Sequence, residues 1–250
     1  VFLMMKHSQQ QQQSFDYTVN SIRTLRSDQM LAAAPSAGEP MMLEDNSSVR
    51  ALPPGTGSNS GNSDLKDKIK LLIETCKSYG AQIDEVTGRK NATKNVSKLV
   101  HTISKSFGYN NSQAMLHYMA GLIYDIGFLN IDPEIFQKDT LTDEEFQLVQ
   151  EHPKIGTNMI HFIDKNLQQV FLDAIKYHHE NLDGTGYPYG ISGDEIPFIA
   201  RVIRVVESYV ALVSSRIYKN ITDKESAIDE LMKNDAHYDL SIIQALNDIV

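Results

Sequence analysis

Residues Tyr177–Pro188 read YHHENLDGTGYP, two histidines and two carboxylates beside a turn that contains two glycines. The helical pattern of apolar residues that ends at Ile175 gives way here to a loop. Adjacent side chains point about 100° apart on a helix, so His178 and His179 can face one metal ion only if the helix unwinds there. The stretch therefore predicts a helix that ends in metal ligands. The alternative is a surface loop whose histidines are merely solvated.

The turn after the histidines has residues that allow this unwinding. Gly184 and Gly186 permit positive φ, and Asp183 suits an Asx-type turn. Pro188 restricts the backbone at the exit of the turn. We therefore expect an irregular loop with a defined conformation directly after His179.

Three further polar residues could supply ligands to the same site. Asp125 ends an apolar helical segment, and His152 precedes a proline at a first helical position. Glu207 lies midway along the most apolar segment, where an unpaired carboxylate would be costly. Together with the histidine pair, these residues follow one another at intervals of 26 to 28 residues, about one helix pair. Helical bundles build metal sites in this way, and imidazole with carboxylate suits iron, manganese or zinc rather than calcium.

Apolar residues recur with helical spacing through the chain after Asp64. Thr142 with Glu145 resembles a capping box that opens a short helix. No segment alternates convincingly as a strand, so the prediction is an all-α bundle, with residues 199–213 at the centre of its core. Helices are predicted around residues 65–76, 96–107, 115–123, 155–163, 170–175 and 199–213, the first two closed by Gly80 and Gly108.

The chain divides near Asp64. Residues 1–63 contain five consecutive glutamines, Gln9–Gln13, and later become rich in Pro, Gly and Ser. Such a segment cannot bury enough apolar surface to offset its chain entropy. We expect residues 1–63 to be a disordered linker or tail and residues 64–250 to be the helical domain. A partner-docking helix around Thr18–Leu31 is the alternative for part of the first segment.

Charge and cysteine content limit the class of protein. The net charge of −9 and the pI near 5.3 argue against binding polymeric nucleic acid through its phosphates. The single cysteine, Cys76, cannot form an internal disulfide, which suits the reducing cytoplasm. No apolar run reaches the 18 residues of a membrane span. The sequence opens on Val1 rather than Met, which leaves open the alternative that it is a fragment of a longer chain with an upstream sensor or membrane domain.

Four motifs together resemble the HD-GYP domain, a subgroup of the HD phosphohydrolases. They are DIG at 125–127, EHPxxG at 151–156, HHENLDGTGYPYGISGDEIPFIARVIRVVE at 178–207 and SSRIYK at 214–219. The match runs from about Asp84 to the C-terminus. The resemblance implies an HD-type helical bundle with two or three metals, usually iron or manganese, that hydrolyses cyclic di-GMP in bacterial signal transduction.

The sequence also departs from this family pattern. The namesake His-Asp pair is Tyr124-Asp125 here, and the lysine expected after DIG is Phe128. An upstream histidine ligand is replaced by Ala92, and the nearby His101 lies too far along its helix to substitute. By the family arrangement, the two missing histidines serve one metal together with the last carboxylate, which is Glu207 in place of an aspartate.

These departures predict one transition metal, iron or manganese first and zinc as an alternative, with the second metal site lost. The resemblance implies Asp125 as the catalytic residue and as a metal ligand together with His152, His178, His179 and Glu207. It also implies a nucleotide-contacting set of Asp183, Gly184, Gly186, Tyr187, Pro188, Arg216 and Lys219.

Two functional classes remain open. In the first, a degenerate HD-GYP domain binds cyclic di-GMP or a protein partner with little or no hydrolysis. In the second, the chain is an active metal-dependent phosphodiesterase with an atypical metal site. A vestigial regulatory module and a homodimer are further alternatives.

Overall fold

The computed structural model describes residues 60–138, 140–214 and 223–250. Most of the predicted linker, residues 1–59, lies outside these ranges, and so do Arg216 and Lys219. By its contacts the chain divides into two units, residues 1–70 and 71–250. The described part of the first unit is the start of a helix. The candidate site belongs entirely to the second unit.

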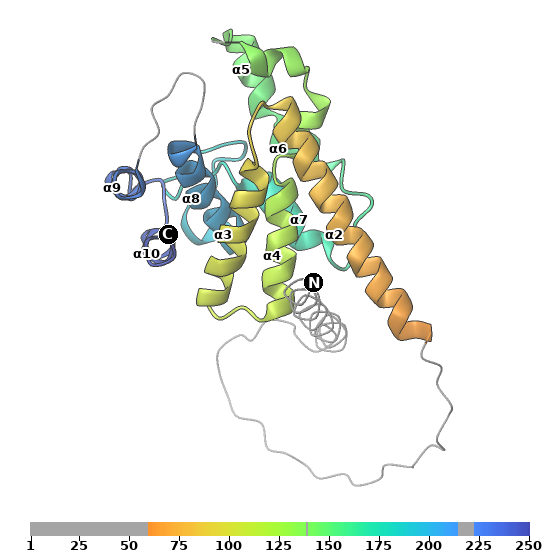
Figure 1. The fold of residues 1–250 in the computed structure, drawn as a ribbon. Coiled ribbons are helices and arrows are strands. Elements are labelled where there is room, and N and C mark those ends of the chain that lie inside the picture. The colour runs from red at the N-terminus through yellow and green to blue at the C-terminus, as the bar shows by residue number, and fades with distance from the viewer. Residues whose placement is uncertain (1–59, 139, 215–222) are drawn as a thin grey trace, which may run out of the picture. The chain divides into compact units, whose positions relative to one another are not determined.

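The described residues form helices and contain no strand, so the all-α prediction is confirmed. The α-helices, labelled as in Figure 1, are α2 Ser60–Val86, α3 Ala92–Ser106, α4 Asn111–Ile123, α5 Asp143–Gln150, α6 His152–Thr157, α7 Gln168–Tyr177, α8 Phe198–Val213, α9 Lys224–Lys233 and α10 Leu240–Asn247. Three short 3-10 helices are η1 Ile126–Asn130, η2 Pro133–Gln137 and η3 Gly193–Glu195.

Side-chain caps fix the start of several helices. The Thr142 hydroxyl accepts the backbone N–H of Glu145, whose carboxylate accepts the backbone N–H of Thr142, so the predicted capping box is confirmed. Asn110 and Gln113 make the same reciprocal pair at the start of α4. These caps satisfy N–H groups that the first turn of a helix leaves without partners.

Two helix boundaries differ from the sequence prediction. Helix α2 continues past Gly80 to Val86, because Gly80 is a packing position rather than a stop. A Cβ at Gly80 would lie 2.9 Å from the Leu122 carbonyl oxygen and 3.0 Å from Thr93 Oγ1, so only glycine permits this close approach. Helix α6 ends at Thr157, well before the predicted residue 163.

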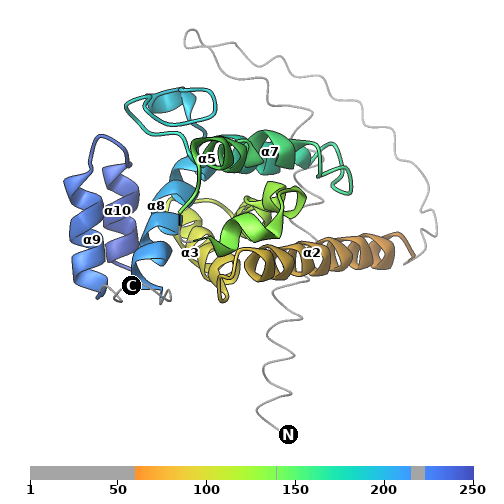
Figure 2. The same ribbon diagram turned by 90° about the horizontal axis from the view of Figure 1, so that it is seen from above.

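Helix α8 lies at the centre of the core, as its apolar pattern predicted. Its residues Val202, Ile203, Val205 and Val206 are fully buried. It packs against α3 and α7 and, on another side, against α9 and α10, which Figure 2 shows beside each other. Because α8 is enclosed by helices on several sides, its apolar residues cannot be confined to a single stripe.

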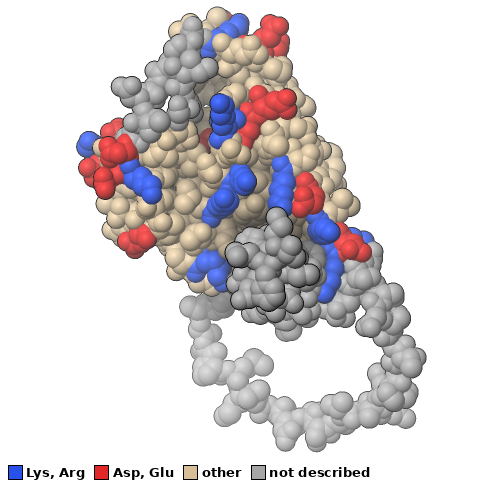
Figure 3. Space-filling model, in the orientation of Figure 1, with Lys and Arg blue, Asp and Glu red and all other residues tan. Residues whose placement is uncertain are grey.

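Surface charge and helix length are the two features of the described residues that concern nucleic-acid and membrane partners. Basic and acidic side chains are interspersed on the face drawn in Figure 3. Among the described helices, none combines the length and the apolarity that a membrane crossing requires.

Candidate metal centre

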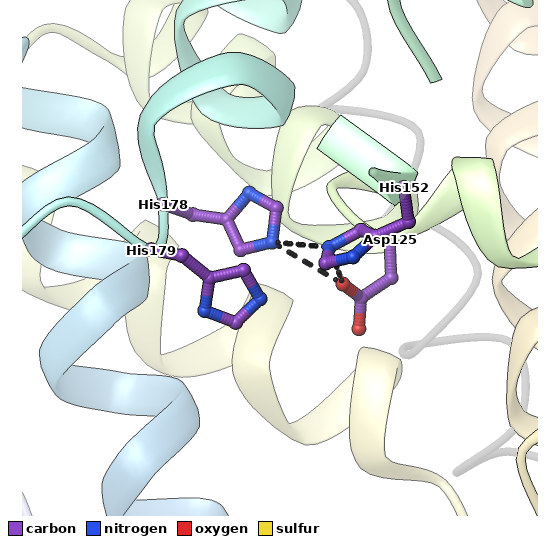
Figure 4. Close-up of side chains that lie close together, drawn as sticks. All are labelled: Asp125, His152, His178 and His179. Carbon is purple, nitrogen blue, oxygen red and sulfur yellow. Dashed lines mark hydrogen bonds and ion pairs between the residues drawn. The ribbon is translucent and has the colours of Figure 1, made fainter. Parts of the chain in front are cut away.

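Four predicted ligands converge in the second unit. Asp125 lies between α4 and η1, His152 opens α6, and His178 and His179 follow the last residue of α7. One ligand atom from each of the four lies within 4.8 Å of the others (Figure 4). Helix α7 ends at Tyr177, so the chain unwinds at the histidine pair as predicted. This unwinding lets two adjacent histidines face the same point.

Hydrogen bonds determine which ring nitrogens face inward. His152 Nδ1 lies 2.7 Å from the Val149 carbonyl oxygen, and His178 Nδ1 lies 2.9 Å from that of Ala174. A carbonyl oxygen can only accept, so in the neutral ring each Nδ1 carries the hydrogen and each Nε2 presents a lone pair. The two Nε2 atoms are 3.1 Å apart.

Asp125 adds a third acceptor to the same point. Its Oδ1 is 3.2 Å from His152 Nε2 and 3.3 Å from His178 Nε2, it is fully buried, and no hydrogen-bond donor reaches it. Buried acceptors that converge without a donor are costly unless a cation lies among them. The residues therefore fit a transition metal held by imidazole and carboxylate, and the carbonyls that hold each Nδ1 orient the rings for it.

Figure 4 also shows His179 beside this group. Its ring stacks on Tyr187, with the ring centroids 4.6 Å apart and the planes 20° from parallel. Burial, reinforced by His178 and His152, holds the pKa of His179 well below its usual range. The ring is therefore neutral near neutral pH and able to offer a lone pair.

The second oxygen of Asp125 has a different partner. Arg89, in the turn between α2 and α3, places its guanidinium 2.7 Å from Asp125 Oδ2 and 3.7 Å from Glu207 Oε1. The hydroxyl of the fully buried Tyr124 donates to Glu207 Oε1 over 3.4 Å. Burial is the largest effect and opposes ionisation of Asp125, but Arg89, His152 and His178 together outweigh it and hold the pKa of Asp125 well below its usual range. Glu207 is thus turned toward Arg89 and Tyr124 and lies outside the four-ligand group.

Tyr124 stands where the family pattern has a histidine, and it is a poor ligand here. Burial, followed by the charges of Glu207 and Asp125, raises the pKa of its phenol well above 10. The phenol therefore stays protonated at neutral pH and acts as a hydrogen-bond donor.

Two glycines bring Asp125 and His152 together. A Cβ at Gly127 would lie 2.0 Å from the His152 carbonyl oxygen, and one at Gly156 would lie 2.9 Å from Ile175 Cγ2. Helix α6 consequently packs directly on η1 and on α7. The glycines of the DIG and EHPxxG motifs thus act through backbone approach, which positions the ligands on either side.

The loop after His179 has the predicted Asx turn, because Asp183 Oδ1 accepts the backbone N–H of Thr185. Gly184 has the expected positive φ of 78°. For Gly186 the predicted reason is wrong, since its φ is not positive. A Cβ there would lie 2.4 Å from Asn181 N and 2.5 Å from the His179 carbonyl oxygen, so glycine is needed for close approach. The bond between Tyr187 and Pro188 is cis.

Glu180 anchors the far side of this loop. Its buried carboxylate accepts the backbone N–H groups of Tyr189 at 2.8 Å and Gly190 at 3.1 Å. Burial raises the pKa of Glu180, and these hydrogen bonds oppose the rise. The residue next to the histidine pair therefore fixes the far end of the loop that follows the pair.

Sequence reasoning missed Arg89 and Glu180. Arg89 lies in the short segment TGRKN between two helices and 36 positions before Asp125, so no local pattern indicates its partner. Glu180 stands beside the ligands, and its position could have suggested a structural role. Ala92, at the start of α3, is buried and offers no ligand.

Comparison with known proteins identifies the fold family. The family model described as HD domain matches residues 70–242. A cyclic di-GMP phosphodiesterase of Thermotoga maritima is 32% identical over 190 residues, 69% of this chain and 52% of that protein. Cyclic di-GMP phosphodiesterase PA4108 of Pseudomonas aeruginosa is 36% identical over 129 residues, 51% of this chain and 31% of that protein.

Another relative bears a different substrate in its name. The 3'3'-cGAMP-specific phosphodiesterase 2 of Vibrio cholerae is 26% identical over 185 residues, 73% of this chain and 35% of that protein. The chain thus spans 31% to 52% of the length of these relatives. A solved structure, Bd1817, a HDG"Y"P protein from Bdellovibrio bacteriovorus, has a TM-score of 0.51 at 19% identity. That match covers 75% of this chain and 69% of Bd1817, and it shows the fold alone. The chain belongs to the HD domain family, as its resemblance to HD-GYP domains predicted.

Proposed function

We propose that this domain binds a cyclic dinucleotide beside a single transition metal and hydrolyses it slowly or not at all. The observation that carries the proposal is that the two carboxylate oxygens of Asp125 have different partners. Its Oδ1 faces three imidazoles, whereas its Oδ2 is already paired with Arg89. One group of ligands is complete and the neighbouring carboxylate, Glu207, is engaged by protein groups.

The ligand chemistry supports iron or manganese, with zinc as the alternative. Three imidazoles and one carboxylate are available at one point. Such an ion supplies a Lewis acid and lowers the pKa of a bound water. Asp125 and the three histidines would hold it, and the carbonyls of Val149 and Ala174 would keep two of the rings in the ligating tautomer.

Cyclic di-GMP is the first candidate ligand, because the relatives from Thermotoga and Pseudomonas are named for it. The loop 183–188 borders the metal centre, with Tyr187 stacked on His179. Arg216 and Lys219 lie outside the described residues and remain predicted phosphate contacts, since guanidinium suits phosphate oxygens. The cGAMP-specific relatives make 3'3'-cGAMP the competitor to test.

The expectation of slow hydrolysis follows from charge. Cleavage of a phosphodiester requires an activated water in line with the leaving oxygen and positive charge on the phosphoryl oxygens. Arg89 cannot bind a water in the way a metal does, and its guanidinium is directed at Asp125 and Glu207. Arg89 thus adds no free positive charge to the phosphoryl oxygens, which supports the expectation of slow hydrolysis.

Three measurements on the purified chain test this proposal. Elemental analysis should give one transition metal per chain, and calorimetric titration should show cyclic di-GMP binding that the chelated protein lacks. Chromatography of the reaction mixture, with manganese or ferrous iron added, should show little linear product.

The alternative is an active phosphodiesterase with an atypical metal site, which the names of the relatives favour. Turnover at a rate comparable to that of a phosphodiesterase with the full family ligand set would establish this alternative. It would reject the proposal that the domain binds the nucleotide with little or no hydrolysis. Absence of cyclic dinucleotide binding would reject both and leave a protein partner as the ligand of the domain.

A further inference from the structure

We propose that Arg89 is a built-in cation that fills the space between Asp125 and Glu207 and thereby restricts the site to one metal ion. The inference rests on the proposed single-metal function and gives it a physical cause. It assigns a role to a residue that lies in none of the sequence motifs.

The contacts of Arg89 are those of a bridging cation. One guanidinium nitrogen lies 2.7 Å from Asp125 Oδ2, and another lies 3.7 Å from Glu207 Oε1. The three side chains are largely removed from solvent, with exposed fractions of 17% for Arg89, 0% for Asp125 and 19% for Glu207. Two carboxylates from different elements thus converge on a single positive group.

Contacts with groups other than the two carboxylates also hold Arg89 in place. Its Nε donates to Thr87 Oγ1, and that hydroxyl donates to the Ile83 carbonyl oxygen at the end of α2. The backbone N–H of Arg89 donates to the carbonyl oxygen of Asp84, and its guanidinium lies 5.7 Å from the centre of the Phe128 ring. A side chain fixed at its backbone, its Nε and one face is a structural part of the site, unlike an exposed arginine.

A metal and this guanidinium exclude each other. A carboxylate–metal bond of about 2.0 to 2.2 Å would need the side of Asp125 Oδ2 and Glu207 that Arg89 now occupies. A divalent ion placed beside the guanidinium would also be repelled by it in surroundings that screen charge weakly. With Arg89 removed, the two carboxylates would face each other uncompensated, and a hard divalent cation would relieve their repulsion.

The test is the number of metal ions bound by Arg89→Gln. Equilibrium dialysis against manganese, read by elemental analysis, should give one ion per unmodified chain and two per Arg89→Gln chain. The matched control is Arg201→Gln, since Arg201 is also partly buried and paired with a carboxylate, Asp239, at 3.0 Å. That variant should keep one ion. The double variant Arg89→Gln/Glu207→Gln should return to one, because a carboxylate of the new site is lost.

The outcomes separate the inference from the proposed function. One ion in both the unmodified chain and Arg89→Gln overturns the role of Arg89 and leaves the single-metal site standing. No ion in the unmodified chain rejects the proposed function itself. Two ions in the unmodified chain reject the inference, because Arg89 would then be no barrier, and they also reject the single-metal function on which it rests.

A second measurement applies if Arg89→Gln does not fold. Crystals of the unmodified chain soaked in manganese should show one anomalous peak, among the three histidines and Asp125. A further peak between Asp125 and Glu207 would overturn the proposal. A single peak in the expected place would support it without any variant.

Discussion

His152 Nε2 and His178 Nε2 lie 3.1 Å apart. In each neutral ring the Nδ1–H group donates to a backbone carbonyl oxygen, so the Nε2 atom presents a lone pair. Two acceptors at this distance repel each other unless a proton or a cation lies between them. Asp125 Oδ1 adds a negative oxygen at 3.2 Å from the first of them. The packing that enforces this arrangement therefore favours a cation among these three atoms.

The first prediction concerns the ligands themselves. His178→Ala/His179→Ala should lose the bound metal, because two of four ligands vanish and the remaining pair cannot hold a transition ion tightly. The measurement is elemental analysis after gel filtration. His161→Ala is the control, since His161 is exposed and is not part of the ligand group. Metal retained at one equivalent in the double variant would show that these histidines are not ligands.

The second prediction concerns a histidine outside the site. His117 is buried, its Nδ1 lies 2.8 Å from Ser104 Oγ, and burial, with a contribution from His101, lowers its pKa to about 4. The folded chain thus keeps this ring neutral, while the unfolded chain protonates it near pH 6.5. The contribution of the neutral His117 ring to the free energy of unfolding should therefore be complete above pH 6.5. It should decrease as the pH drops toward 4, by about 3 kcal/mol at most.

Denaturant unfolding at several pH values, with a chelator present, measures this dependence. His117→Phe should flatten the curve between pH 6.5 and 4, because phenylalanine cannot take up a proton and suits the aromatic neighbours Tyr109 and Phe198. His161→Phe should leave the slope unchanged. An unaltered slope in His117→Phe would mean that other groups cause the acid sensitivity.

The third prediction concerns backbone approach. Gly127→Ala should destabilise the domain and weaken metal binding at least tenfold, because its Cβ would need the space of the His152 backbone and no rotamer relieves a backbone clash. Gly88→Ala is the comparison: its φ of +66° costs about 1 to 2 kcal/mol, but nothing lies near its Cβ. Thermal unfolding and metal titration distinguish the two. Equal metal affinities in both variants would contradict the positioning role of Gly127.

The fourth prediction separates the loop from the metal. Glu180→Gln replaces an acceptor oxygen by an amide that cannot accept the N–H groups of Tyr189 and Gly190 together, at a cost of about 1 to 3 kcal/mol. Cyclic dinucleotide affinity should fall, while the metal content stays at one. Glu195→Gln, at an exposed glutamate in η3, should change neither quantity. Loss of the metal in Glu180→Gln would show that loop and ligands cannot be uncoupled.

The sequence predicted which histidines gather around Asp125, because their chemistry is local, but it also placed in this group Glu207, which lies outside it. A histidine pair at a helix end, and a histidine before a proline, indicate their own position, and the structure brings both to Asp125. Gly80 was misread because a glycine that ends a helix and one that lets two helices approach look alike in a sequence. The partner of Arg89 depends on how the turn between α2 and α3 packs on Asp125 and Phe128, which no spacing rule encodes.

The spacing of the ligands has a further consequence, for how the chain holds together. An ion bound to Asp125, His152 and His178 would cross-link three elements and close two long loops, as a covalent staple does. Folding would then be linked to the supply of metal: at a free concentration one hundred times the dissociation constant, binding adds about 2.7 kcal/mol to the free energy of unfolding. The lifetime of the folded domain in a cell would accordingly follow the availability of the ion.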